Sequence, residues 1–191
     1  YEGKIATEVD DKNRMHPIKK FAGKSIIWID TSMMDRKDES RLKGGSYCNY
    51  AENTLVKKLL EGFKNEGVLP NLDIGIITGY RGQKDLIRKS VNNSGYDRIA
   101  KEIDINTLDA FQGRENDIII YSTVRTKNSI GFQKEKERVN VAFSRAKNLL
   151  IICGDMDFFY KFDNPDNKFI EIIDYICEHE DECLVIPGGE I

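Results

Sequence analysis

The chain has 191 residues, of which 40% are hydrophobic and 32% are charged, and its formal net charge is −3. This length and composition predict one soluble globular domain with a hydrophobic core of its own. The slightly negative charge excludes a global positive field that would attract nucleic acid, so any basic footprint must be local. Two basic segments qualify, at residues 36–43 and 134–147.

The four cysteines are widely spaced, with no Cys-x-x-Cys pair and no histidine in metal-ligand spacing. We therefore expect reduced thiols in a cytoplasmic protein and no metal site. No apolar run is long enough to cross a bilayer, so no membrane contact is expected. The chain begins with Tyr1 and not with Met, which we interpret as a fragment of a longer protein.

The first third of the chain predicts a lead-in, a strand and a helix. Residues 1–24 are polar without a sustained period, and residues 25–30 form a short apolar run typical of a buried strand. A charged loop at 33–47 precedes a helix that has Ser46 or Asn49 as its N-cap and is stopped by Gly67 and Pro70. The apolar face of this helix carries Leu55, Val56, Leu59, Leu60 and Phe63.

Further along the chain, strands are predicted at 73–78, 103–107, 117–124, 148–154 and 183–186, and helices at 82–93, 135–147 and 167–179. Continuous apolar strands separated by helices predict an α/β fold, with a mainly parallel central sheet flanked by helices. In the helix at 135–147, Arg138 and Arg145 are seven residues apart, so we expect them to project together. The aromatic residues at 158–162 are expected to fill the core.

In open α/β sheets, ligands bind beyond the carboxyl ends of the strands. Polar loops at 78–83, 107–115, 123–125 and 154–155 are therefore expected to converge on one edge of the sheet. Their arginines, hydroxyls, glycines and one tyrosine favour a ligand that carries phosphate. The sequence has no Gly-x-x-x-x-Gly-Lys-Ser/Thr loop, so the chain cannot cradle a triphosphate in that manner by itself.

Three stretches resemble motifs IV, V and VI of superfamily 1 helicases, in the right order: residues 76–83 (Ile-Ile-Thr-Gly-Tyr-Arg-Gly-Gln), 105–117 and 138–147 (Arg-Val-Asn-Val-Ala-Phe-Ser-Arg-Ala-Lys). The up-frameshift-protein-like subgroup is the most similar. The motor of this family has two RecA-like domains with ATP bound between them. The resemblance implies that residues 25–191 are the second domain, a RecA-like three-layer sandwich, and that residues 1–24 lead in from an upstream motor domain.

The resemblance also implies roles for individual residues. Arg145 would be the arginine finger, Glu115 would hold the ribose, and Tyr80 would lie against the adenine. Gln83, Gly113 and Arg138 would be further nucleotide contacts. The backbone of the nucleic acid would be contacted by Thr78, Thr107 and Arg125.

The ligands that follow are ATP with Mg²⁺, both held mainly by the upstream domain, and single-stranded nucleic acid, with DNA slightly favoured over RNA. The isolated chain is therefore expected to be inactive. Gly79 stands where the family has proline, which predicts a looser loop around Tyr80. Residues 14–17 match part of a further family motif, but we interpret that match as accidental and give His16 no role.

Two other interpretations remain open. A helicase half without hydrolysis could act as a binding module for nucleic acid or for a partner protein. A nuclease site built from Asp104, Asp109, Glu115 and Asp117 is the weaker alternative, because no lysine stands in Asp/Glu-x-Lys spacing with them.

Overall fold

The computed structural model describes residues 15–111 and 114–191. The strands are β1 (Ile26–Asp30), β2 (Ser40–Arg41), β3 (Tyr47–Cys48), β4 (Asp73–Thr78), β5 (Glu102–Thr107), β6 (Asn116–Ser122), β7 (Ala146–Gly154) and β8 (Cys183–Pro187). The helices are α1 (Tyr50–Asn65), α2 (Arg81–Ser94), α3 (Lys136–Phe143), α4 (Met156–Lys161) and α5 (Phe169–Glu178). Short 3₁₀ turns include η2 (Lys19–Phe21), η4 (Tyr96–Arg98), η5 (Leu108–Ala110) and η6 (Gly131–Lys134).

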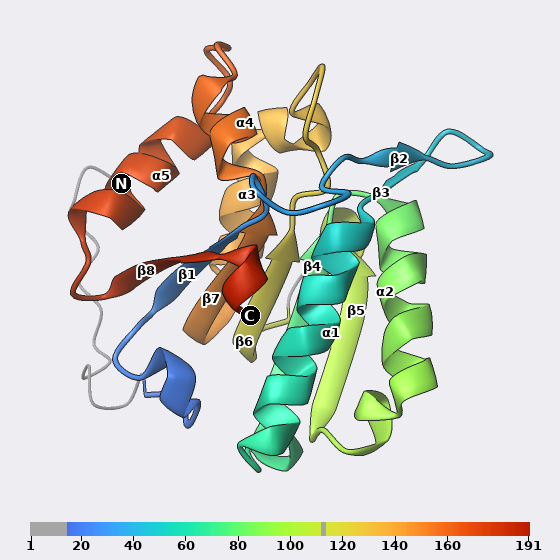
Figure 1. The fold of residues 1–191 in the computed structure, drawn as a ribbon, viewed down its shortest axis with the longest axis vertical. Helices are drawn as coiled ribbons and strands as arrows, with labels where there is room; N and C mark the ends of the chain where they lie inside the picture. Colours follow the sequence, from blue (N-terminus) through green and yellow to red (C-terminus); the bar gives the residue numbers. More distant parts are fainter. Residues whose placement is uncertain (1–14, 112–113) are drawn as a thin grey trace.

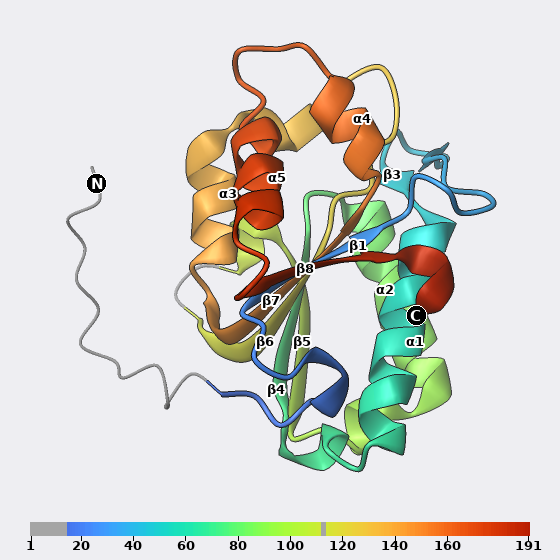
Figure 2. The ribbon, with the colours of Figure 1, turned by 60° about the vertical axis from the view of Figure 1, so that its left-hand side comes forward.

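Six strands form one sheet in the order β5-β4-β6-β7-β1-β8, and every neighbouring pair is parallel. Helices α1 and α2 cover one face, and α3, α4 and α5 lie over the other (Figures 1 and 2). The three-layer α/β fold predicted from the sequence is therefore confirmed, including the edge strand near the C-terminus.

Each strand contributes side chains to two separate cores, because successive residues point to opposite faces of a sheet. In β6, Ile118 and Ile120 pack with α1 and α2, whereas Ile119 and Tyr121 pack with α3 and α5. All four side chains have 0% exposure. The uninterrupted apolar run in this strand thus reflects burial on both faces, as predicted.

Helix α1 begins at an asparagine cap. The side chain of Asn49 accepts a hydrogen bond from the backbone N–H of Glu52 at 3.0 Å, which satisfies one of the free donors of the first turn. Ser46, the alternative cap, instead accepts from the N–H of Gly82 at 3.0 Å and so ties the loop to α2. The predicted apolar stripe of α1 is buried.

The predicted helix at 135–147 is wrong at its C-terminal end. Helix α3 ends at Phe143, and Ala146 already pairs with Asn116 as the first residue of β7. The apolar spacing that indicated a longer helix is also compatible with a turn between α3 and β7, because Phe143 and Ala146 pack on the same core from these two different elements. The β2–β3 hairpin falls largely within the segment 33–47 that is predicted to be a loop, and α4 lies in a segment for which no element is predicted.

The aromatic segment at 158–162 divides between core and surface. Phe159 in α4 is fully buried and packs against Trp28, as expected, whereas Tyr160 is 49% exposed. Near the start of the described chain, Ile18 and Phe21 belong to the core under α1, and the domain boundary at residue 24 stays a prediction. Among the described helices, none is both long and apolar enough to span a bilayer.

Candidate functional site

The predicted site residues lie at two opposite edges of the sheet. Strands β5 and β6 are parallel with β4 between them, so the chain must return from the carboxyl end of β5 to the amino end of β6. Thr107 therefore lies at the carboxyl edge, and Glu115 lies at the amino edge. A strand of this length separates them by roughly 20 Å. The prediction that residues 107–115 all converge on one edge is wrong for Arg114 and Glu115.

Packing over β4 fixes the path of this crossover. Phe111 is 2% exposed, and its ring would lie 2.6 Å from a Cβ placed on Gly75, so the glycine provides the space that the ring occupies. Beyond that point, Nη1 of Arg114 pairs with Oδ2 of Asp104 in β5 at 3.0 Å. Gly113 lies outside the described residues, and its nucleotide contact stays a prediction.

At the amino edge, Glu115 and Arg145 lie at the ends of adjacent strands. The N–H of Asn116 donates to the carbonyl oxygen of Arg145 at 3.0 Å. Glu115 is exposed, and Arg145 is half-buried with its Nε donating to the carbonyl of Val141 at 3.2 Å. Within the described part of the chain, no hydrogen bond or ion pair engages the Nη atoms of Arg145. These atoms can donate to an anion.

Arg138 lies near the other edge. Its guanidinium pairs with Glu135 at 2.7 Å and with Asp109 at 3.5 Å, and both acids line a cleft at the carboxyl edge. The prediction that Arg138 and Arg145 project together is wrong, because α3 ends before Arg145.

A cleft of about 800 Å³ opens at the carboxyl edge, and we call it the carboxyl-edge cleft. It lies between the ends of β4 and β5, the loop before β3 and the turn η6. Its aromatic lining is Tyr47, Tyr80 and Phe132. Its hydroxyls are those of Ser46, Thr107 and Ser129, and its cations are Arg81, Arg125 and Lys134.

Tyr80 forms the inner wall of this cleft and is 4% exposed. Its ring packs edge-on against Tyr47 at 5.7 Å and tilted against Phe132 at 5.2 Å between ring centroids. Burial raises the pKa of the Tyr80 hydroxyl, which accepts from Nη1 of Arg125 at 3.4 Å. The structure does not bring Tyr80 together with Glu115 and Arg145.

Two other predicted residues are buried beneath the cleft. The amide of Gln83 accepts from the N–H of Asn49 at 2.8 Å and donates to Oγ of Ser122 at 2.9 Å. Thr78 has 0% exposure, and its hydroxyl accepts from the N–H of Tyr80 at 3.4 Å. Gln83 and Thr78 therefore stabilise the backbone beneath the cleft through hydrogen bonds, whereas Thr107 is half-buried and lines the cleft.

Arg125 is held in place by charge and by an aromatic ring. Its Nε donates to Oε1 of Glu39 at 3.1 Å, and its guanidinium carbon lies 4.4 Å from the centroid of the Tyr47 ring. The preceding residue, Val124, has φ of 71°, which is a strained conformation for a β-branched residue. Arg125 therefore lines the cleft in one fixed orientation.

A buried glutamate side chain supports that strained turn. Glu52 is fully buried and accepts hydrogen bonds from Oγ of Ser122, from Oγ1 of Thr123 and from the N–H of Val124. Burial raises the pKa of Glu52 to about 8, against these hydrogen bonds, which lower it. The sequence carries one signal for this residue, because Glu52 precedes Leu55 and Val56 on the apolar face of α1. Glu39 lies in a loop and carries no such signal.

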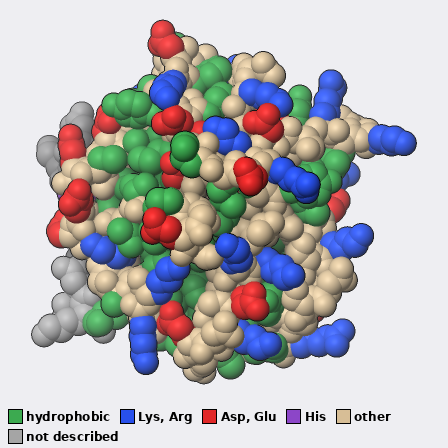
Figure 3. Space-filling view, in the orientation of Figure 1, with side chains coloured by type: hydrophobic (Ala, Val, Ile, Leu, Met, Phe, Trp, Pro, Cys, Tyr) green, Lys and Arg blue, Asp and Glu red, His purple; other side chains and the backbone are tan. Residues whose placement is uncertain are grey.

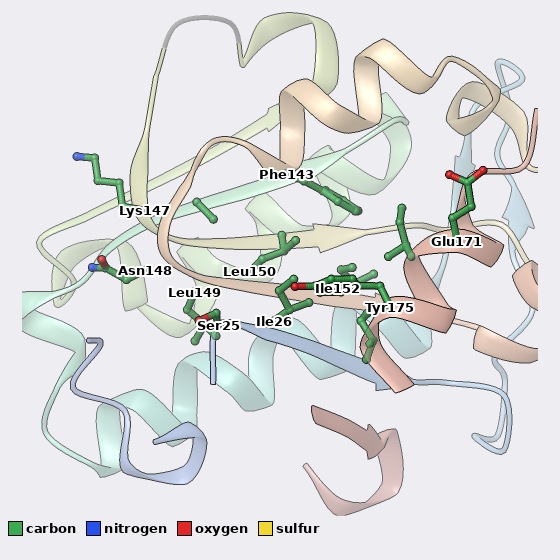
Figure 4. Close-up of a pocket in the computed structure, with 13 residues that line it drawn as sticks. Ser25, Ile26, Phe143, Lys147, Asn148, Leu149, Leu150, Ile152, Glu171 and Tyr175 are labelled. Carbon is green, nitrogen blue, oxygen red and sulfur yellow. The ribbon is translucent and has the colours of Figure 1, made fainter. Parts of the chain in front are cut away.

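A second pocket, of about 390 Å³, lies between α5, α3 and strands β1 and β7 (Figure 4). Figure 4 shows Lys147 and Asn148 at one end and Glu171 at the other, with apolar side chains between them. This lining favours contact with an apolar group over phosphate. Across the described residues, no group of three or more His, Cys, Asp or Glu side chains is arranged to hold a metal ion.

The fold and the two edges define a RecA-like α/β domain. The sequence profile of a family described as an AAA domain matches residues 1–157. The chain therefore belongs to this family, and its resemblance to superfamily 1 helicases of the up-frameshift-protein-like subgroup is confirmed.

The similar proteins are much longer than this chain. The DNA polymerase alpha-associated DNA helicase A of Saccharomyces cerevisiae is 33% identical over 158 residues, which cover 80% of this chain and 22% of that protein. A regulator of nonsense transcripts 1 homolog of Drosophila melanogaster is 41% identical over 123 residues, which cover 62% and 10%. The ATP-dependent helicase NAM7 of Saccharomyces cerevisiae is 32% identical over 164 residues, which cover 81% and 16%.

Proposed function

We propose that this chain is the second motor domain of an ATP-dependent helicase or translocase, with the nucleotide at the amino edge and a single strand at the carboxyl edge. The observation that carries the proposal is the pair of Glu115 and Arg145 at adjacent strand ends, with the Nη atoms of Arg145 available to an anion. In this arrangement Glu115 accepts from the ribose hydroxyls, and Arg145 donates to the γ-phosphate.

Arg145 stabilises the charge that develops on the transferring phosphoryl group, and such arginines contribute roughly 10³ to 10⁵ in rate. The upstream domain supplies the phosphate-binding loop and the magnesium ligands, so the finger acts only when the two domains close. The rigid sheet between the two edges then moves the strand-binding surface with each closure. On this proposal residues 1–191 alone do not hydrolyse ATP.

The carboxyl edge provides the surface for the strand. Thr107 and Arg125 line the carboxyl-edge cleft and donate to phosphate oxygens, while Thr78, Gln83 and Tyr80 hold its wall. Lys and Arg side chains are interspersed with acidic ones on the face seen in Figure 3, which supports a local phosphate footprint over a broad basic field. We propose single-stranded DNA as the first track to test, with RNA as the second.

We propose a cytoplasmic location because the four cysteines are free thiols, three of them buried.

The experiment is an Arg145→Ala change in the complete protein, with Arg98→Ala as a control at an exposed arginine in η4. We expect ATP binding to persist in both variants. Hydrolysis stimulated by a single strand should fall by roughly 10³-fold or more in Arg145→Ala only. A wild-type rate of ATP hydrolysis in Arg145→Ala would exclude the role of Arg145 as an arginine finger. A wild-type protein that binds strands without any hydrolysis would instead favour a non-hydrolytic binding module.

A further inference from the structure

Phe132 is an exposed aromatic ring on a rigid frame. The ring is 47% exposed, although its neighbours Ile130 and Gln133 are 0% and 1% exposed. The amide of Gln133 donates to the carbonyl of Thr123, which joins η6 to the turn after β6. The backbone that carries Phe132 is therefore clamped from both sides.

Gly131 provides the close approach that this frame requires. Its φ is 61°, and a Cβ at this position would lie 1.9 Å from the hydroxyl of Tyr80 and 3.3 Å from Nη1 of Arg125. Only glycine fits here. The Phe132 ring consequently stands against the Tyr80 ring and Gly79, and the rest of its surface faces the carboxyl-edge cleft.

The charges around the ring favour an anionic partner. Asp109 and Glu135 on one wall both pair with Arg138, so this guanidinium compensates one of their two negative charges. Arg81 and Lys134 are exposed on the cleft, and neither forms an ion pair with any described residue. An aromatic surface that shares a cleft with two available cations matches a base and its flanking phosphates, because base stacking and phosphate contacts are the two components of single-strand binding.

We propose that the carboxyl-edge cleft binds one nucleobase of the single strand, stacked on Phe132, with the flanking phosphates at Arg81 and Lys134. The proposal rests on the proposed function, since it assumes that the strand runs along this edge. It assigns the cleft a base contact in addition to backbone contacts. Stacking tolerates any base, so the contact adds affinity without sequence preference.

The test compares two strands on the complete protein: a fluorescein-labelled oligothymidylate and an abasic strand of the same length. Phe132→Ala should weaken binding of oligothymidylate by about tenfold or more and change binding of the abasic strand little. The salt dependence should be unchanged in Phe132→Ala, whereas Lys134→Ala should reduce the slope of log K against log salt by about one. Tyr160→Ala is the control, because Tyr160 is equally exposed but lies in α4.

Phe132→Trp provides a direct readout of stacking. The 191 residues contain a single tryptophan, Trp28, which has 0% exposure. Quenching that strand binding causes in Phe132→Trp and not in the parent protein would therefore report on position 132. Phe132→Trp should retain the affinity for oligothymidylate and be quenched by it. Equal weakening of both strands in Phe132→Ala, or no weakening at all, would overturn the base contact and leave the motor proposal standing. If the wild-type protein bound neither strand, both proposals would fail.

Discussion

Glu52 shows how one residue can support a binding surface without reaching it. Its carboxyl group accepts from the N–H of Val124, the strained residue that aims Arg125 into the carboxyl-edge cleft. Burial raises the pKa of Glu52 to about 8, so the folded state holds a proton that the unfolded chain releases near its ordinary value of 4.5. The stability that this proton contributes is complete below the unfolded pKa and is lost as the pH rises towards the folded pKa.

Replacing Glu52 by Gln should therefore remove a pH dependence. Between pH 5 and pH 8, the free energy of unfolding of the wild-type chain should fall relative to that of Glu52→Gln by on the order of 4 kcal/mol. Urea unfolding of the 191-residue chain at several pH values measures this. In Glu61→Gln, at an exposed position of α1, the free energy of unfolding should change with pH as it does in the wild-type chain. If the free energy of unfolding of Glu52→Gln also changed with pH as in the wild-type chain, the buried carboxyl group of Glu52 would be ionised throughout this pH range.

Among the elements, the crossover from β5 to β6 decides which residues meet. It passes over β4 at Gly75, where Phe111, Ile119 and Asn116 would all lie within 3 Å of a Cβ. The crossover can follow this path because Gly75 has no side chain. This crossover separates Thr107 from Glu115 and so places the candidate site residues at two opposite edges of the sheet.

A methyl group at Gly75 should displace the crossover. We expect Gly75→Ala to destabilise the chain by roughly 1–3 kcal/mol through overpacking. Gly62→Ala, within α1, meets no atom within 4 Å and should instead stabilise it by roughly 0.5–1 kcal/mol, because alanine favours the helix. Denaturant midpoints of the two variants should therefore move in opposite directions. A neutral Gly75→Ala would mean that the crossover can shift without cost.

The local sequence pattern predicted most helices and strands correctly, but it did not predict which distant residues lie close together. The Ile118–Ile120 run indicated a strand buried on both faces, and the spacing of Leu55 to Phe63 indicated the buried face of α1, because both signals are periodic. The position of Glu115 depends on β4 lying between β5 and β6, which no local pattern encodes. The pair of Glu39 and Arg125 joins residues 86 positions apart, and only the fold brings them together.

In the whole molecule, the candidate site residues form two groups at opposite edges of one rigid sheet. The amino edge carries Glu115 and Arg145, and the carboxyl edge carries a cleft with aromatic, hydroxyl and cationic groups. Because the two sets of side chains are far apart, changes at one edge should alter one kinetic parameter and leave the other.

The most direct test is the rate of ATP hydrolysis by the complete protein, measured as a function of single-strand concentration. In a protein that carries both Arg81→Ala and Lys134→Ala, we predict that the strand concentration for half-maximal stimulation rises about tenfold or more while the maximal rate is retained. In Arg145→Ala, the maximal rate should be lost at every strand concentration. Loss of the maximal rate in both variants, or a change only in half-maximal concentration in both, would contradict the separation of the two edges.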